Sequence, residues 1–263
     1  MKKCVKMVAG LLALVLLAGC IPVQSEQTDA PTEPAAPTTP AAEATTEATV
    51  AATQEDVEYE GDASSYYIDV VYAQQIDRYY TALSQQWDET AYYEHEMSAL
   101  PALYYDGNPL DNVGFGFVDL DNDGYWELVI GAIRDAEINP AVFEIWTLVD
   151  GEPVMLLQAG VRNRYILQHV EEDRMWYVAY EGDNGAANYA THYLMLSEGK
   201  IEVVQGIVFD AMASEKEPWF LTHDLDWDVS NDEPIDEKTA NAILDSNRNL
   251  YTALEYFPYS LYK

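Results

Sequence analysis

Eight short runs of β-branched and aromatic residues follow one another along the middle of the chain, and they constrain the fold more than any other feature. The runs cover 114–119, 126–133, 141–149, 153–159, 163–169, 174–181, 187–196 and 200–209. Tight turns separate them, most of them an acidic residue followed by glycine, as at 123–124, 150–151 and 198–199. Because connections this short join antiparallel neighbours, the sequence predicts a β-meander.

Two parts of this series resemble each other. "IWTLVDGEPVMLLQAG" at 145–160 and "HYLMLSEGKIEVVQGI" at 192–207 each contain an apolar run, an acidic–glycine turn and a second apolar run, and Gly151 and Gly199 lie 48 residues apart. Each unit would hold four strands, the size of a propeller blade. Two blade-like four-stranded units cannot close a propeller, so we expect an open, twisted antiparallel sheet or two such sheets. The alternative is that any series of hairpins looks self-similar.

Helical patterns flank the meander. Before it, apolar side chains recur at spacings of three and four at Ile68, Tyr72, Ile76, Tyr79, Leu83 and Trp87. This stripe predicts one helix of about 25 residues that packs on the core, although its aromatic residues would also suit a sugar platform. After it, 234–256 predicts a second helix beside the first. The fold class expected is α+β, a central antiparallel meander framed by N- and C-terminal helices.

The N-terminus has the pattern of a targeting segment. Three lysines, Lys2, Lys3 and Lys6, precede an apolar run over 8–17 that is shorter than the roughly 20 residues of a membrane-spanning helix. It ends in Leu-Ala-Gly-Cys at 17–20 and there resembles bacterial lipoprotein signals. The resemblance implies cleavage before Cys20, a diacylglycerol on the Cys20 sulfur, and anchoring to the extracytoplasmic side of the cell membrane. The alternative is an ordinary secretory signal with a chance cysteine.

Three regions follow from this pattern. Residues 1–19 form the signal peptide, and 20–55 form the lipidated cysteine with a linker of mostly Thr, Ala, Pro and Glu, too poor in apolar surface to fold. Residues 56–263 form a single extracellular domain. The only cysteines are Cys4 and Cys20, so this domain has neither a disulfide nor a thiolate metal site.

Charge narrows the partners of the domain. From Asp56 onward there are 40 acidic residues, which are the chain's 46 less six earlier ones, and 10 basic residues, which are its 13 less three. The net charge of about −30 argues against nucleic acid and anionic surfaces as direct ligands. It suits cations, cationic partners or neutral saccharides, and solubility alone is the other interpretation.

The sharpest chemical signal is "DLDNDGYWE" at 119–127. Asp119, Asp121 and Asp123 occupy alternate positions of an extended chain and therefore share a face, and Gly124 permits a sharp turn after them. Ca²⁺ takes six to eight oxygen ligands at about 2.3–2.6 Å. A cation would offset the mutual repulsion of these carboxylates.

The motif departs from an EF-hand, because Ile130 stands where the bidentate glutamate should be and both flanks are strand-like. Residues 116–131 resemble instead the calcium loops of FG-GAP and VCBS β-hairpin repeats. The resemblance implies a structural Ca²⁺ bound by the side chains of Asp119, Asp121, Asp123 and Glu127 and by the carbonyl of Tyr125. Those families carry several copies and this chain carries one, which is a further reason not to expect a propeller. A metal-free acidic hairpin turn is the alternative.

A second acidic alternation places aspartates at Asp224, Asp226, Asp228 and Asp232. Val229 occupies the position of the glycine. We therefore expect a solvated loop or strand edge here rather than a second cation site.

Catalytic motifs are missing from the sequence. It contains no G-x-S-x-G, no H-E-x-x-H and no glycine-rich phosphate loop, and its four histidines, His95, His169, His192 and His223, are scattered. The sequence therefore predicts a calcium-stabilised binding or interaction domain with an extracellular protein or saccharide ligand. The alternative is a surface hydrolase that cleaves extracellular glycans with a pair of carboxyl groups.

Overall fold

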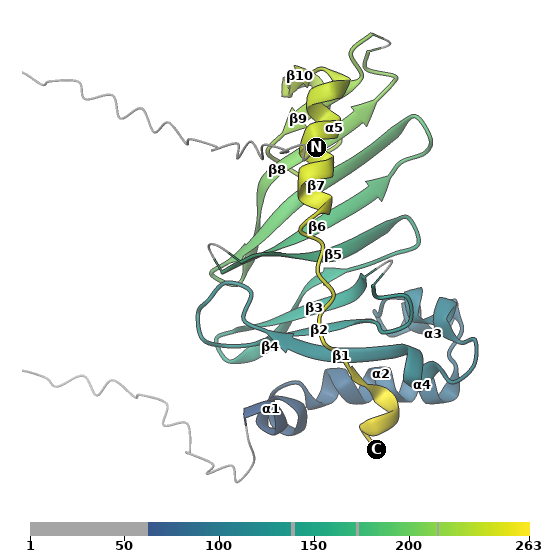
Figure 1. Ribbon diagram of the computed structural model, residues 1–263. Helices are drawn as coiled ribbons and strands as arrows, with labels where there is room; N and C mark the ends of the chain where they lie inside the picture. The colour runs from purple at the N-terminus through teal and green to yellow at the C-terminus, as the bar shows by residue number, and fades with distance from the viewer. Residues whose placement is uncertain (1–62, 138–139, 172–173, 215) are drawn as a thin grey trace, which may run out of the picture. The chain divides into compact units, whose positions relative to one another are not determined.

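The computed structural model describes residues 63–137, 140–171, 174–214 and 216–263 (Figure 1). The predicted signal peptide, Cys20 and the linker lie outside the described residues. The described part is an α+β fold with an 11-stranded, open, antiparallel sheet in the order β10-β9-β8-β7-β6-β5-β3-β2-β1-β11, and β4 pairs with β3 beside this path. The predicted fold class is confirmed. No helix in the described ranges has the length and apolarity to cross a membrane.

Eight of the strands lie within two residues of the predicted runs. They are β1 (Val113–Val118), β2 (Glu127–Ala132), β3 (Ala141–Val149), β4 (Glu152–Gln158), β5 (Asn163–Val170), β6 (Met175–Asp183), β7 (Asn188–Ser197) and β8 (Lys200–Asp210). Three short strands were not predicted: β9 (Trp219–Thr222), β10 (Glu233–Ile235) and β11 (Phe257–Pro258). Strands of two to four residues are too short to show a period, so only pairing with a neighbour identifies them.

The internal repeat corresponds to two equivalent hairpins, β3–β4 and β7–β8, within one continuous sheet. Both turns are built from two residues with positive φ, at 54° and 81° for Asp150 and Gly151 and at 50° and 71° for Glu198 and Gly199. Both ladders also shift register at the same place, between Ile145 and Trp146 and, 48 residues later, between Tyr193 and Leu194. The predicted units are therefore similar hairpins of a single sheet rather than separate blades.

The predicted first helix is broken into three pieces. They are α1 (Ala63–Tyr66), a π-helical turn η1 (Tyr67–Val71) and α2 (Ala73–Gln85). Tyr72 has non-helical angles (φ −110°, ψ 17°), its ring stacks on Tyr67 and Phe117, and its hydroxyl donates to the carbonyl of Trp126 at 2.9 Å. Packing around Tyr72 thus overrides the helical pattern of the sequence.

The apolar stripe of α2 is core, as predicted. Ile76, Tyr79 and Leu83 are fully buried and belong to one cluster with Phe115, Ile130 and other residues of β1 to β3. Three short elements complete this end: α3 (Glu89–Glu94), capped by the Asp88 side chain, the 3₁₀ helix η2 (Leu100–Tyr104), and α4 (Pro109–Asn112). The helical elements before β1 therefore fix the β1–β2 hairpin against a dense aromatic core.

The C-terminal helix is shorter than predicted and lies elsewhere. α5 (Glu237–Arg248) starts at the Asp236 cap, whose side chain accepts from Thr239 N at 2.7 Å. It packs Ala240 and Leu244 on Ile207 and Trp219 of β8 and β9, far along the sheet order from α2 (Figure 1). The expectation that the two helices pack side by side is wrong, because each covers an opposite end of the sheet.

The residues after α5 return to the first strand in an extended conformation. Thr252 N donates to Leu167 O at 2.9 Å, and β11 then pairs with β1. Tyr256 covers Gly131 of β2, where an added Cβ would lie 2.3 Å from the tyrosine hydroxyl. A glycine at this point of β2 is what lets the returning segment lie close to the sheet. Two 3₁₀ turns, η3 (Val229–Asn231) and η4 (Tyr259–Leu261), complete the elements.

Candidate metal centre

The acidic loop connects β1 to β2 at the densely packed end of the sheet. Val118 pairs with Glu127, so the loop closes directly on the last rung of the hairpin. Asn122 and Gly124 both have positive φ, at 60° and 91°, which turns the chain sharply between the two strands. The turn predicted at Gly124 is therefore present, and it curls the acidic residues toward one another.

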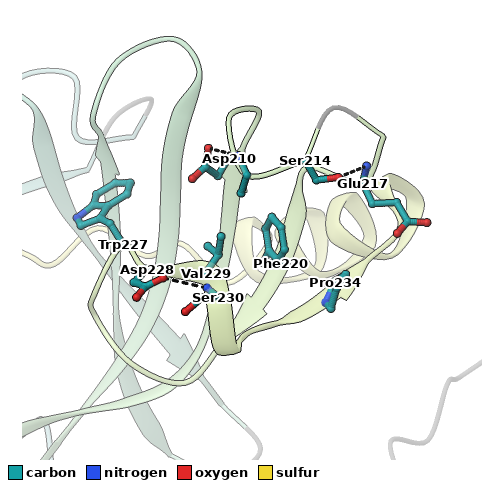
Figure 2. Close-up of a pocket in the computed structure, with 10 residues that line it drawn as sticks. Asp210, Ser214, Glu217, Phe220, Trp227, Asp228, Val229, Ser230 and Pro234 are labelled. Atoms are coloured by element: carbon teal, nitrogen blue, oxygen red, sulfur yellow. Dashed lines mark hydrogen bonds between the residues drawn. The ribbon is translucent and has the colours of Figure 1, made fainter.

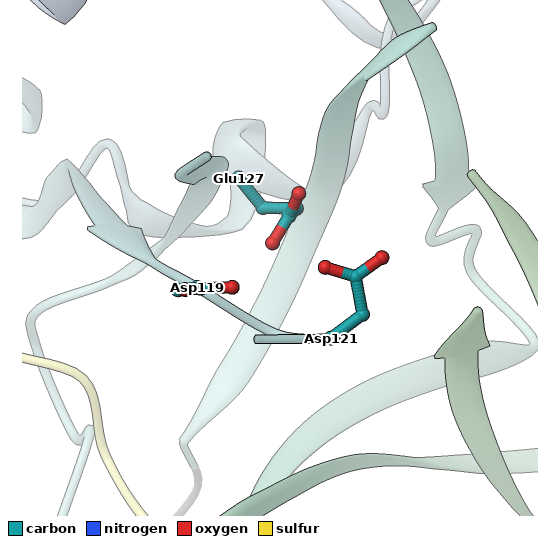
Figure 3. Close-up of side chains that lie close together, drawn as sticks. All are labelled: Asp119, Asp121 and Glu127. Atoms are coloured by element: carbon teal, nitrogen blue, oxygen red, sulfur yellow. The ribbon is translucent and has the colours of Figure 1, made fainter. Parts of the chain in front are cut away.

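Three carboxylates converge in this loop (Figure 3). One oxygen each from Asp119, Asp121 and Glu127 lie within 4.8 Å of one another, with Glu127 buried and the two aspartates half-buried. Among the Asp, Glu, His and Cys side chains of the described residues, these three form the group whose geometry suits a metal ion. The partly buried acidic triad could hold a metal ion.

Glu127 is the fixed point of the triad. Its side chain is buried, with 1% of the residue exposed, and it accepts hydrogen bonds from Leu120 N at 2.7 Å and from the Thr147 hydroxyl at 2.9 Å. The pKa of Glu127 is raised to about 7: burial is the largest cause, the two hydrogen bonds oppose it, and the nearby charges of Asp121 and Asp123 add to it. A bound cation would favour the ionised form of this carboxyl group.

The two aspartates of the triad are held by the turn itself. Asp119 accepts from Asp123 N and from Gly124 N, both at 3.1 Å, and Asp121 accepts from Asp123 N at 3.3 Å. Burial raises the pKa of Asp121, and the charge of Asp123 adds to the shift. The backbone thus aims both side chains at the space beside Glu127.

The two other predicted ligands lie differently. Asp123 is outside the converging group, and its carboxylate accepts from Tyr125 N at 2.7 Å. Tyr125, expected to offer its carbonyl oxygen, donates its amide to Asp123 and exposes its side chain. Of the five predicted ligands, the structure therefore brings Asp119, Asp121 and Glu127 together.

The sequence did not predict the residues outside the loop that hydrogen-bond to it. Thr147 of β3 orients Glu127, and Tyr67 accepts from Trp126 N at 3.1 Å while stacking on its ring. β3 reads AVFEIWTLV, in which Glu144 and Thr147 are the two polar residues and both are buried. A polar side chain in such an apolar run was the available signal that a buried partner exists.

The second acidic alternation uses its carboxylates on its own backbone. Asp224, Asp226 and Asp228 each accept from the amide two residues later, at 3.2, 2.8 and 3.1 Å. Asp228 lies at the rim of a hollow floored by Phe220 and Val229 (Figure 2). Such Asx-turns are typical of loops. In the described part of the chain, the carboxylates of this stretch do not form a group that could hold a metal ion.

Comparisons with protein-family models, with curated proteins and with solved structures give no match to this chain.

Proposed function

We propose that this protein is a lipid-anchored, extracytoplasmic binding domain whose β1–β2 loop is stabilised by Ca²⁺. The observation that carries the proposal is the convergence of Asp119, Asp121 and Glu127 within 4.8 Å, with Glu127 buried. Three ionised carboxylates in such a space repel one another, and a cation among them would offset that repulsion.

The donor set favours Ca²⁺ over other metals. The three converging ligands are all carboxylate oxygens, which hard cations prefer, whereas zinc and copper sites draw mainly on His and Cys. Mg²⁺ demands near-ideal octahedral geometry at about 2.0–2.1 Å, while Ca²⁺ accepts longer, irregular shells of six to eight oxygens. Asp123 and the Tyr125 carbonyl, which lie in the same loop, would add two further oxygens to that shell after a local rearrangement, and water would supply the rest.

The proposed role of the ion is structural. Extracellular calcium modules bind with dissociation constants of about 0.1–1 mM, so millimolar Ca²⁺ would add about 0.5–1.5 kcal/mol to the stability of the fold. Glu127 is poorly placed to act as the general acid of a glycan hydrolase, because a general acid must reach its substrate and Glu127 is 1% exposed with both oxygens accepting hydrogen bonds.

Calorimetric titration of the chelator-treated full chain with Ca²⁺ tests the cation. We expect saturable heat and a rise in melting temperature, both lost in Asp121→Ala. Asp226→Ala, the same change in the second acidic run, is the matched control and should bind like the unmodified chain. Absence of heat and of a melting shift in the unmodified protein would overturn the proposal, as would equal losses in the two variants.

The anchor rests on the lipobox-like sequence around Cys20 and is tested separately. The unmodified chain should be recovered in the membrane fraction of a bacterial host, with the mass of a lipidated cysteine at its N-terminus. Cys20→Ala should move the protein out of that fraction. Membrane recovery of Cys20→Ala at the level of the unmodified chain would contradict lipid anchoring.

A further inference from the structure

A second hollow, of about 370 Å³, lies between the end of α5 and the strands β5 to β7. Three arginines line it: Arg162 directly before β5, Arg164 in β5 and Arg248 at the last position of α5. The domain from Asp56 onward has only 10 basic residues, so this concentration is not a consequence of composition.

The hollow is far less negative than the domain as a whole. Its lining carboxylates are Glu181 and Asp183, which against three arginines leave a net charge of +1, and Asp245, which lies 3.8 Å from Arg248 beside the lining, brings the group to zero. The rest of the domain is strongly negative, about −30 in all. The net charge argues against anionic partners over the surface as a whole, and this hollow is a local exception that net charge cannot reveal.

The three arginines differ in their carboxylate partners and in how exposed they are. Arg164 holds the Glu181 carboxylate through Nε at 2.6 Å, and the same carboxylate accepts from the Tyr251 hydroxyl at 2.8 Å. Arg162 donates through Nη2 to Asp183 at 2.7 Å, with 62% of its side chain exposed. Arg248 lies 3.8 Å from Asp245 with 53% exposed. Since a guanidinium carries five N–H donors, Arg162 and Arg248 retain donors for a ligand.

An aromatic wall stands beside these donors. Tyr189 lies in the same cross-strand row as Asp183, and its ring is fixed by stacking on Phe209 (centroids 4.7 Å apart) and by the edge of Trp219. Its residue surface is 37% exposed. Rigid aromatic faces suit the apolar face of a ring-shaped ligand, while Asn163 and Thr191 of the lining offer polar groups.

We infer that this hollow binds the carboxylate of a small acidic saccharide, with Arg162 and Arg248 as the donors. A planar carboxylate matches the guanidinium fork in a bidentate manner. A ligand with a single negative charge suits a hollow in which basic and acidic side chains are balanced, whereas the surrounding negative field disfavours a doubly charged phosphate. The inference extends the proposed binding role, and the site shares no residue with the cation loop.

The test uses the full chain and glucuronate as the probe. We expect saturable binding with a dissociation constant on the order of 1 mM, typical of a monosaccharide-sized contact area, with glucose and inorganic phosphate both at least tenfold weaker. Arg248→Gln and Arg162→Gln, on different elements, should each weaken glucuronate binding at least tenfold. Lys238→Gln removes the same charge from the other end of α5 and should have no effect.

Three outcomes would overturn the inference. They are no saturable glucuronate binding, equal affinity for glucose or phosphate, and equal weakening by Lys238→Gln and Arg248→Gln. The melting temperature of each variant separates lost binding from lost folding, and Arg162→Lys, which keeps the charge and removes the fork, should also weaken binding. Asp121→Ala should bind glucuronate normally in Ca²⁺-free buffer, so failure of the cation proposal is distinguishable from failure of this one.

Discussion

The two acidic runs of this protein share a spacing and differ in what the fold does with it. In 119–127 the aspartates alternate across a turn between two buried strands, and three carboxylates meet. In 224–232 the aspartates alternate along a loop, and Asp224, Asp226 and Asp228 each accept from the backbone amide two residues later. Alternating aspartates therefore do not by themselves make a cluster.

Two residues account for the difference. Gly124 at φ 91° turns the first run back on itself, and Glu127, at the start of β2, supplies a buried carboxylate for the aspartates to face. The second run has Val229 in place of the glycine, with 8% of its surface exposed in a small core with Phe220. There the chain is pulled inward by an apolar side chain, and the acidic side chains remain outside.

The comparison is tested most strongly at Glu127. In millimolar Ca²⁺, Glu127→Ala should lower the free energy of unfolding by about 2–4 kcal/mol, because Leu120 N and the Thr147 hydroxyl lose a buried partner and the ion loses a ligand. Asp232→Ala, at the corresponding end of the second run, should cost less than about 1 kcal/mol. Urea unfolding of both variants measures the difference.

Glu127→Gln separates the two contributions at this position. The amide keeps the shape of the side chain and can still accept from Leu120 N, so its cost should fall between those of the unmodified chain and Glu127→Ala. Its calcium heat should nevertheless be lost. Equal costs for Glu127→Ala and Asp232→Ala would show that the buried carboxylate does not distinguish the two runs.

Gly124 is the next largest effect. No atom lies within 4 Å of an added Cβ, so Gly124→Ala meets no steric clash, but φ of 91° is unfavourable for a residue with a side chain. We expect Gly124→Ala to lower the free energy of unfolding by about 1–2 kcal/mol.

The reciprocal change, Val229→Gly, should not create calcium binding in the second run. Saturable heat on titration of that variant with Ca²⁺ would mean that the turn alone defines the site.

Much of the fold could be predicted from the sequence, because short local patterns determine most of its strands. Eight strands were predictable from alternation and from acidic–glycine turns, whose positive φ values at Asp150 and Gly151 recur at Glu198 and Gly199. The break at Tyr72 was not predictable, because it depends on Trp126 and Phe117, which lie more than 40 residues away in sequence. The end of α5 at Arg248 likewise depends on pairing of the following residues with β5.

The candidate site was predictable in part for the same reason. Spacing identified Asp119, Asp121 and Glu127, because a hairpin turn brings alternate residues to one side. It could not place Asp123, whose carboxylate bonds to a neighbouring amide instead, or Thr147, which reaches Glu127 from another strand. The arginine-lined hollow could not be predicted from the sequence, because Arg162 and Arg248 are brought to one site only by the packing of α5 on the sheet.

The smallest expected effect concerns the point where the second run approaches the core. His192 of β7 is fully buried, and neither ring nitrogen has a hydrogen-bond partner in the described part of the chain. Burial lowers its pKa below the ordinary 6.5, and the charge of Asp224 opposes the shift. Tyr180, Gly206 and Thr222 surround the ring without charge.

The sign of the pH dependence follows from this lowered pKa. Below pH 6.5 the unfolded chain takes up a proton at His192 while the folded chain does not, so stability falls with acid until the folded pKa is reached. His192→Leu should flatten the dependence of the melting temperature on pH just below 6.5, and Asp224→Asn should steepen it by removing the opposing charge. If Asp224→Asn melts with the same dependence on pH as the unmodified chain, the charge of Asp224 has no effect on His192. The second acidic run would then differ from 119–127 in having no electrostatic effect on the core.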